Sequence, residues 1–314
     1  ATPHNGHSNS FSALLEILDP IRFTRGVPVE GADALAPIMV RRLKRDLRQL
    51  GVERFPRRIL TSIALRHTAK GWSATATRDD AESGKRDPST LLADNLEGAP
   101  HELELSALLA RYTELCAPAS GRGRLVFINL QKRLLSSPEA FARTLDVHAQ
   151  AVKKAGGVRV QHIQTELDTD PETHGVDDET LAAEEDAEVR AASAALPSPT
   201  AEATDLLSRM RAVADKARRQ PDGKARALLA WLRAALCPGI GLATPSAKQR
   251  AWTDRRVILF TEYGDTKRYY QELLAEAVAG TDRADERILV LHGGMSDEAR
   301  DEVQRAFNQD PKDH

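Results

Sequence analysis

Cysteine is nearly absent from this sequence, and the two that occur, Cys116 and Cys237, belong to no CxxC pair and no Cys/His cluster. This pattern argues against a disulfide framework and against a zinc site. The sequence also lacks an apolar run of about 18 residues, the length needed to cross a bilayer, and it does not open on a signal peptide. We therefore expect a soluble protein of the reducing cytoplasm, with no membrane partner.

The usual signatures of nucleotide chemistry are missing as well. No phosphate loop of the form GxxxxGK[ST] is present, because Gly84-Lys85 and Gly223-Lys224 lack both the earlier glycine and the following hydroxyl residue. The histidines are scattered, and no Ser/His/Asp or Cys/His arrangement stands out. We predict no catalytic residue and no metal ligand within this sequence.

The stretch DEAR, from Asp297 to Arg300, resembles a DExx box, whose carboxylates hold a magnesium ion. Such a box needs its carboxylates at the end of an apolar strand. Here Ser296 is placed to cap a helix, and Asp297 and Glu298 fall in the first turn, where the helix dipole favours acidic side chains. The pattern indicates the start of a helix.

A basic segment lies in the first fifty residues, although the formal net charge of the whole chain is only -2. From Ile38 to Leu50, IMVRRLKRDLRQL places apolar residues on one helical face and arginine and lysine on the other. The basic face is either an ordinary solvated surface or a surface that follows nucleic-acid phosphates. Composition leaves both readings open.

The middle of the chain is predicted to be mostly helical. After Pro56 the segment RRILTSIAL favours a strand, and residues 70–89 are expected to form an exposed loop. Apolar residues then repeat three and four apart, which predicts helices. Residues 165–200 are acidic and poor in large apolar side chains, so we expect a flexible linker there.

The last ninety or so residues favour an alternation of strands and helices. The apolar runs RVILFTEYG and RILVLHGG are each followed by a helical pattern, which predicts a parallel α/β sheet with right-handed crossovers. Ligands of such sheets bind beyond the carboxyl ends of the strands. This rule singles out Thr261-Glu262 and His292-Gly293-Gly294, although either group alone is also common in ordinary loops.

Several blocks together resemble the Swi/Snf-type superfamily-two ATPases. ATPHNG followed by FSALLEILDPIRF is similar to the third helicase motif and the block after it, and RRLKRDL with FPRR to the basic block near the exit of the first motor lobe. LQKRLLSSPEAFARTL resembles a helical block of bacterial members. DGKARALLAWL, VILFTEYGDTKRYYQELL and LHGGMSDEARDEVQRAFN are similar to the opening of the second lobe. The blocks stand in the family's order.

The resemblance implies an α/β fold that is an incomplete two-lobe RecA-like helicase core. Residues 1–66 would end the first lobe, residues 67–222 would form a mostly helical insertion, and residues 223–314 would form the first half of the second lobe. The chain would then be an internal fragment that starts in motif III and stops before motif V. The bacterial branches that it resembles are the RNA-polymerase-associated remodellers and the DISARM-type phage-defence helicases.

The resemblance also assigns roles to individual residues. Motif III, which couples the nucleotide site to bound DNA, would comprise Ala1, Thr2 and Pro3. The residues expected to contact DNA are Thr261, Gly293 and Gly294, together with Arg42, Lys44 and Arg45 near the lobe junction.

The resemblance implies that the parent protein is a DNA-dependent ATPase that uses ATP and Mg²⁺ and moves along duplex DNA without reading its sequence. The chain by itself would not hydrolyse ATP, because the phosphate loop, the DExx box and the arginine fingers would lie outside it. The alternative is a noncatalytic protein-interaction module, in which the helical insertion and the acidic segment bind a protein partner.

Overall fold

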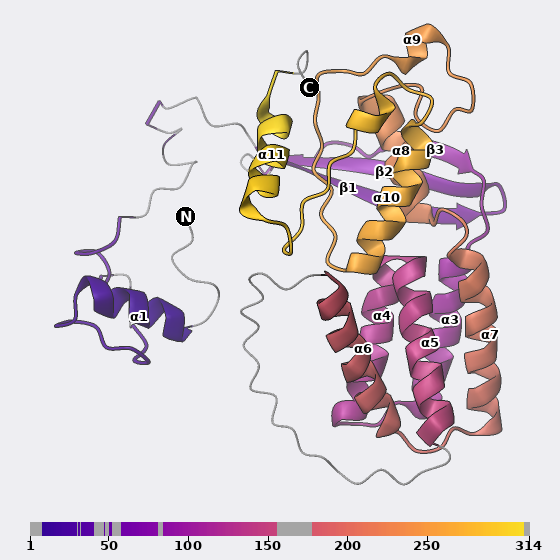
Figure 1. The fold of residues 1–314 in the computed structure, drawn as a ribbon, viewed down its shortest axis with the longest axis horizontal. Coiled ribbons are helices and arrows are strands. Elements are labelled where there is room, and N and C mark those ends of the chain that lie inside the picture. The colour runs from indigo at the N-terminus through magenta and orange to yellow at the C-terminus, as the bar shows by residue number, and fades with distance from the viewer. Residues whose placement is uncertain are drawn as a thin grey trace. The chain divides into compact units, whose positions relative to one another are not determined.

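The computed structural model describes residues 8–29, 31, 33–40, 47, 50–51, 58–80, 84–155 and 178–310. The chain divides into two compact units, Ala1–Leu60 with Arg78–Asp87 and Thr61–Thr77 with Pro88–His314. The fold is mixed α/β and mostly helical (Figure 1). Within the described parts, no helix is both long enough and apolar enough to cross a membrane.

In the first unit, helix α1 spans Ser8–Leu18 and confirms the helix predicted from FSALLEIL. Leu15 is buried on its inner face, and the amide of Gly26 donates a hydrogen bond of 2.9 Å to the Ser12 hydroxyl. The helix stops at Asp19-Pro20, because the proline ring disfavours helical backbone in the residue before it.

A three-stranded antiparallel sheet follows, with the order β1 (Ile59–Thr68), β2 (Gly71–Asp80) and β3 (Thr90–Leu96). Strand β1 confirms the strand predicted after Pro56. The prediction of an exposed loop over residues 70–89 is wrong for β2, where Trp72 and Ala74 are buried on one face. The alternation was missed because its inward residues after Trp72 are alanines, which carry little hydrophobic signal.

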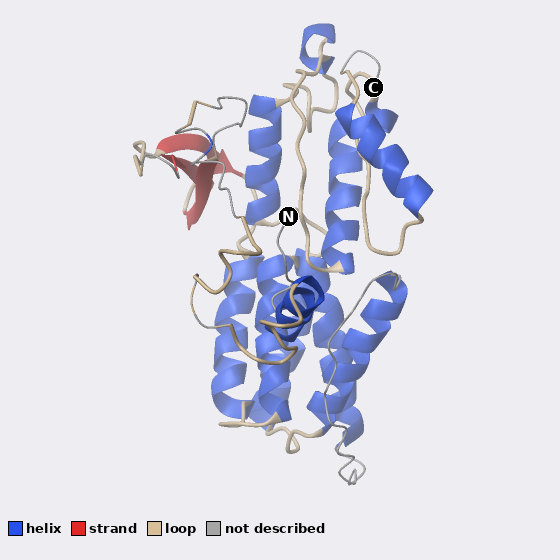
Figure 2. Cartoon of the chain, turned by 90° about the vertical axis from the view of Figure 1, so that its left-hand side faces the viewer, coloured by secondary structure: helices blue, strands red, loops and turns tan. Residues whose placement is uncertain are grey.

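Five helices form an antiparallel bundle in the second unit, seen in Figures 1 and 2. They are α3 (His101–Cys116), α4 (Arg122–Ser136), α5 (Pro138–Ala155), α6 (Asp178–Ala194) and α7 (Ala201–Ala217). Helix α5 packs against α4, α6 and α7, and α3 packs against α7. The buried side chains of the core include Leu105, Leu109, Tyr112, Leu130, Phe141, Leu145 and Met210. Each contributes about 1.5–3 kcal/mol by leaving water.

Helix α6 corrects the prediction of a flexible linker over residues 165–200. Its residues Val189 and Ala192 are buried, and it packs on α4 and α5. Its acidic side chains pair with arginines of those helices, which offsets the charge repulsion that the acidic composition implies. Residues 165–177 of the predicted linker lie outside the described part of the chain.

The remaining helices include the two predicted to follow the C-terminal apolar runs, at 264–278 and 297–308, and these two predictions are confirmed. In chain order, the remaining helices are α8 (Gly223–Ala235), α9 (Ala247–Arg250), α10 (Gly264–Val278), the 3-10 helix η1 (Ala284–Glu286) and α11 (Asp297–Asn308). The Ser296 hydroxyl accepts a hydrogen bond of 3.3 Å from the amide of Ala299. The DEAR stretch therefore begins a capped helix, as predicted.

The two strands predicted in this region do not form. Across 251–262 and 287–295, all of which the structure describes, no residue is paired in a strand, and the predicted parallel sheet is absent there. Several apolar side chains of these extended segments are exposed, Phe260 to 88% and Leu291 to 55%. The apolar run marks strand propensity, but a strand also needs a hydrogen-bonded neighbour.

Candidate functional site

Two loops in the second unit precede α10 and α11, and they contain the residues that the sequence singled out there. Thr261 is half-buried in the first loop, and Gly293 and Gly294 are exposed in the second. A Cβ atom on Gly293 would meet nothing within 4 Å, so none of the described residues fills the space beside this backbone. The Arg300 side chain donates to the Gly293 carbonyl and holds the turn from the α11 side.

Positively charged side chains near one loop act on a residue of the other. Burial lowers the pKa of His292, and the positive charges of Lys267 on α10 and Arg300 on α11 lower the pKa further. The pKa of Lys267 is itself lowered, first by burial and then by Arg268. Because these like charges destabilise one another, an anion such as a phosphate group would be favoured beside them.

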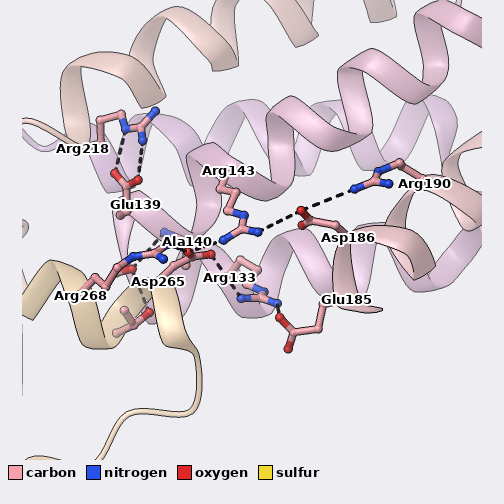
Figure 3. A network of polar contacts seen from close by, with 12 residues as sticks. Arg133, Glu139, Ala140, Arg143, Glu185, Asp186, Arg190, Arg218, Asp265 and Arg268 are labelled. Carbon is pink, nitrogen blue, oxygen red and sulfur yellow. Dashed lines mark hydrogen bonds and ion pairs between the residues drawn. The ribbon is translucent and has the colours of Figure 1, made fainter. Parts of the chain in front are cut away.

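A buried carboxylate anchors the start of α10 to the helical bundle. Asp265 is 6% exposed and accepts a hydrogen bond of 2.9 Å from Arg143 of α5 and another from Arg268 (Figure 3). Arg143 also donates to Asp186 of α6 over 3.0 Å. Asp265 is therefore compensated by arginines from two different helices, as a buried charge requires.

Arg133 of α4 contacts the same region from another side. Its guanidinium lies 3.7 Å from the ring centre of Tyr263, 4.0 Å from a carboxylate oxygen of Asp265, and in an ion pair with Glu185. The Thr266 hydroxyl lies 2.7 Å from the hydroxyl of Ser136 at the end of α4. The loop from Thr261 to Gly264 thus leads directly into a polar junction with the bundle.

The structure places only part of the predicted DNA-contacting set. Thr261, Gly293 and Gly294 lie in the two loops, whose charged neighbours interact. The other predicted site residues lie outside the described part of the chain: Ala1, Thr2, Pro3, Arg42, Lys44 and Arg45.

Sequence reasoning missed the charged residues around the loops. Lys267 could have been found, since the run DTKR directly follows the predicted strand and opens a helix. The pairing of Asp265 with Arg133 and Arg143 could not be found, because Asp265 is separated from Arg143 by 122 positions and no local pattern connects them.

A second polar cluster lies inside the bundle. The side chains of Tyr112, His148 and Ser193 form a hydrogen-bonded chain, and all three residues are buried. Burial lowers the pKa of His148 to about 4. All three side chains are closed off from solvent and hydrogen-bonded to one another, so the cluster is a satisfied part of the hydrophobic core.

Comparisons with known proteins do not add to this geometry: no protein-family model, curated protein or solved structure matches the chain. Among the residues that the structure describes, no three His, Cys, Asp or Glu side chains are grouped so that they could hold a metal ion.

Proposed function

We propose that this chain is part of an ATP-dependent DNA translocase and that the loops before α10 and α11 contact the phosphate backbone of duplex DNA. The observation that carries the proposal is the shared neighbourhood of His292, Lys267 and Arg300 beside the open backbone of Gly293. Basic side chains, hydroxyls and backbone amides bind phosphates without reading bases. The order of the helicase-like sequence blocks supports the same conclusion.

On this proposal, the RecA-like lobes of the motor close and reopen during the ATPase cycle, and the two loops hold the strand along which the motor steps. Within the part of the chain that the structure describes, the one remaining Gly-Lys pair of the second unit is not placed to hold the phosphates of ATP–Mg²⁺. The ammonium group of Lys224, in the pair Gly223-Lys224, donates to the carbonyl oxygens of Leu135 and Ser136, the latter at 2.7 Å. It caps α4 and does not face an open phosphate site, so the nucleotide is assigned to other parts of the motor.

DNA binding provides the direct test. We expect a labelled, mixed-sequence duplex to bind the chain with an affinity that falls as salt rises. Lys267→Ala is expected to reduce the slope of log affinity against log salt by about 0.9, the value for one lost phosphate contact. Lys154→Ala is the matched control, because it removes an exposed lysine at the far end of α5 from the Ser137–Thr266 contact.

ATP hydrolysis provides the second test. The motor that contains this chain is expected to hydrolyse ATP faster with duplex DNA, whereas the chain alone is expected to show no turnover. If the chain does not bind duplex DNA at low salt, the proposal that these loops contact DNA is wrong.

A protein-interaction module is the second candidate function, and one observation favours it. Leu125, Ile128 and Leu135 of α4 share one helical face of the bundle and are exposed, Leu135 to 72%. Exposed apolar faces of this kind are common in protein interfaces. An inert motor whose bundle still bound a protein partner would support this candidate.

A further inference from the structure

The loop from Thr261 to Gly264 is held in place without a sheet. In the described stretch 251–262, no residue pairs in a strand, so ladder hydrogen bonds do not fix the backbone that leads into the loop. A loop that contacts a ligand must nevertheless keep its geometry, because each contact depends on placement within a fraction of an ångström. Some other interaction must therefore hold it.

Arg133 is the side chain that contacts this loop most directly from the bundle. Its guanidinium stacks on Tyr263 at 3.7 Å and lies 4.0 Å from Asp265, one residue before and one residue after Gly264. The residue is buried, and its ion pair with Glu185 of α6 fixes the other end of the guanidinium. One side chain therefore connects the loop to two helices of the bundle.

We propose that Arg133 is a positioning residue for the loop Thr261–Gly264, holding it in the conformation in which it meets a phosphate backbone. The consequence for DNA binding depends on the proposed function, whereas the positioning of the loop does not. The planar guanidinium is essential, since one flat group stacks on an aromatic ring while its N–H groups reach two carboxylates. A lysine carries the same charge but cannot make both kinds of contact.

Amide hydrogen exchange of the chain tests the positioning alone. Arg133→Lys is expected to speed exchange of the Lys267 amide about tenfold, because this amide donates to the Tyr263 carbonyl of the loop over 3.0 Å and opens when the loop loosens. The control is Arg218→Lys, which alters a bidentate pair with Glu139 at 2.8 Å within the bundle. The control is expected to leave exchange of the Lys267 amide unchanged. Tyr263→Leu, which removes the ring and keeps the ion pairs, is expected to loosen the loop as well.

DNA binding then separates positioning from direct contact. Arg133→Lys is expected to weaken duplex binding about tenfold with an unchanged salt slope, because no phosphate contact is lost. A slope that falls by about 0.9 while exchange of the Lys267 amide stays unchanged would make Arg133 a phosphate ligand and overturn the proposal. Unchanged exchange of this amide in both Arg133→Lys and Tyr263→Leu would overturn it too. If the wild-type chain binds no duplex, the proposed function fails, and exchange of this amide alone decides the positioning.

Discussion

The phenol oxygen of Tyr112 lies 2.8 Å from Nε2 of His148, in the interior of the helical bundle. On the other side of the ring, Nδ1 lies 2.7 Å from the Ser193 hydroxyl, which itself donates to the Val189 carbonyl. Because the Ser193 proton is used on that carbonyl, Nδ1 donates and Nε2 accepts from Tyr112. The neutral imidazole is therefore satisfied at both nitrogens.

This geometry predicts a loss of stability in acid. Burial lowers the pKa of His148 from 6.5 to about 4, so the unfolded chain binds the proton first as the pH falls. The stabilisation is complete above pH 6.5 and is lost towards pH 4, by about 3 kcal/mol in total. Urea unfolding at neutral and acidic pH measures this loss of stability. His148→Leu should flatten this part of the profile; an unchanged profile would assign the acid sensitivity to other groups.

Gly71 opens β2 at a backbone position that alanine does not fit. Its φ is +111°, and a Cβ atom there would lie 2.7 Å from the Leu96 carbonyl oxygen. Gly71→Ala is expected to lower the free energy of unfolding by more than about 2 kcal/mol. Gly84→Ala isolates the backbone effect, because Gly84 also has a positive φ, +67°, but has open space around its Cβ position. Its expected cost is about 1 kcal/mol. Equal costs for both variants would contradict the predicted clash.

Asp265→Asn removes the charge that three arginines surround. We expect a loss of about 3 kcal/mol in unfolding free energy, because the buried guanidinium of Arg133 and the half-buried one of Arg143 lose part of their compensation. Asp79→Asn is the comparison, since its ion pair with Arg86 is exposed and is expected to contribute less than about 1 kcal/mol. Chemical denaturation of both variants measures the difference, and a cost below that of Asp79→Asn would argue against a structural role for the cluster.

His292 should make DNA binding depend on pH if the loops contact phosphates. Its pKa is lowered in the free chain, and a bound phosphate would raise the pKa by favouring the charged ring. Binding then takes up a proton, so affinity is expected to increase as the pH falls below about 6.5. Anisotropy titrations over this pH range measure the effect. His292→Gln should remove most of it, and a variant with the wild-type pH profile would place the titrating group elsewhere.

Most of the described helices were predictable because their apolar residues repeat at helical spacing and their ends carry clear signals. Helix α11 illustrates both, with Ser296 as its cap and acidic residues in its first turn. Strand β2 was hidden because Ala74 fills an inward position where a larger apolar residue would have shown the alternation. Helix α6 was hidden because its composition resembles that of a solvated linker.

The charged residues of the candidate site were only partly predictable from the sequence. Thr261 and Gly293 could be selected from their positions after apolar runs, and the structure places them in loops whose charges interact. Arg133 and Asp265 belong to distant parts of the sequence, and only the packing of α10 against the bundle brings them together. Long-range ion pairs of this kind leave no periodic trace in a single sequence.

The apolar run from Val257 to Phe260 is exposed, and it pairs in no strand within the described part of the chain. These features bear on whether the protein self-associates. Short apolar segments of high strand propensity promote self-association between chains, as do unpaired sheet edges. Here Arg255 precedes the run and Glu262 follows shortly after it. Flanking charges of this kind act as gatekeepers, because burying them between stacked chains costs free energy. We therefore expect Arg255 and Glu262 to oppose aggregation of the concentrated protein.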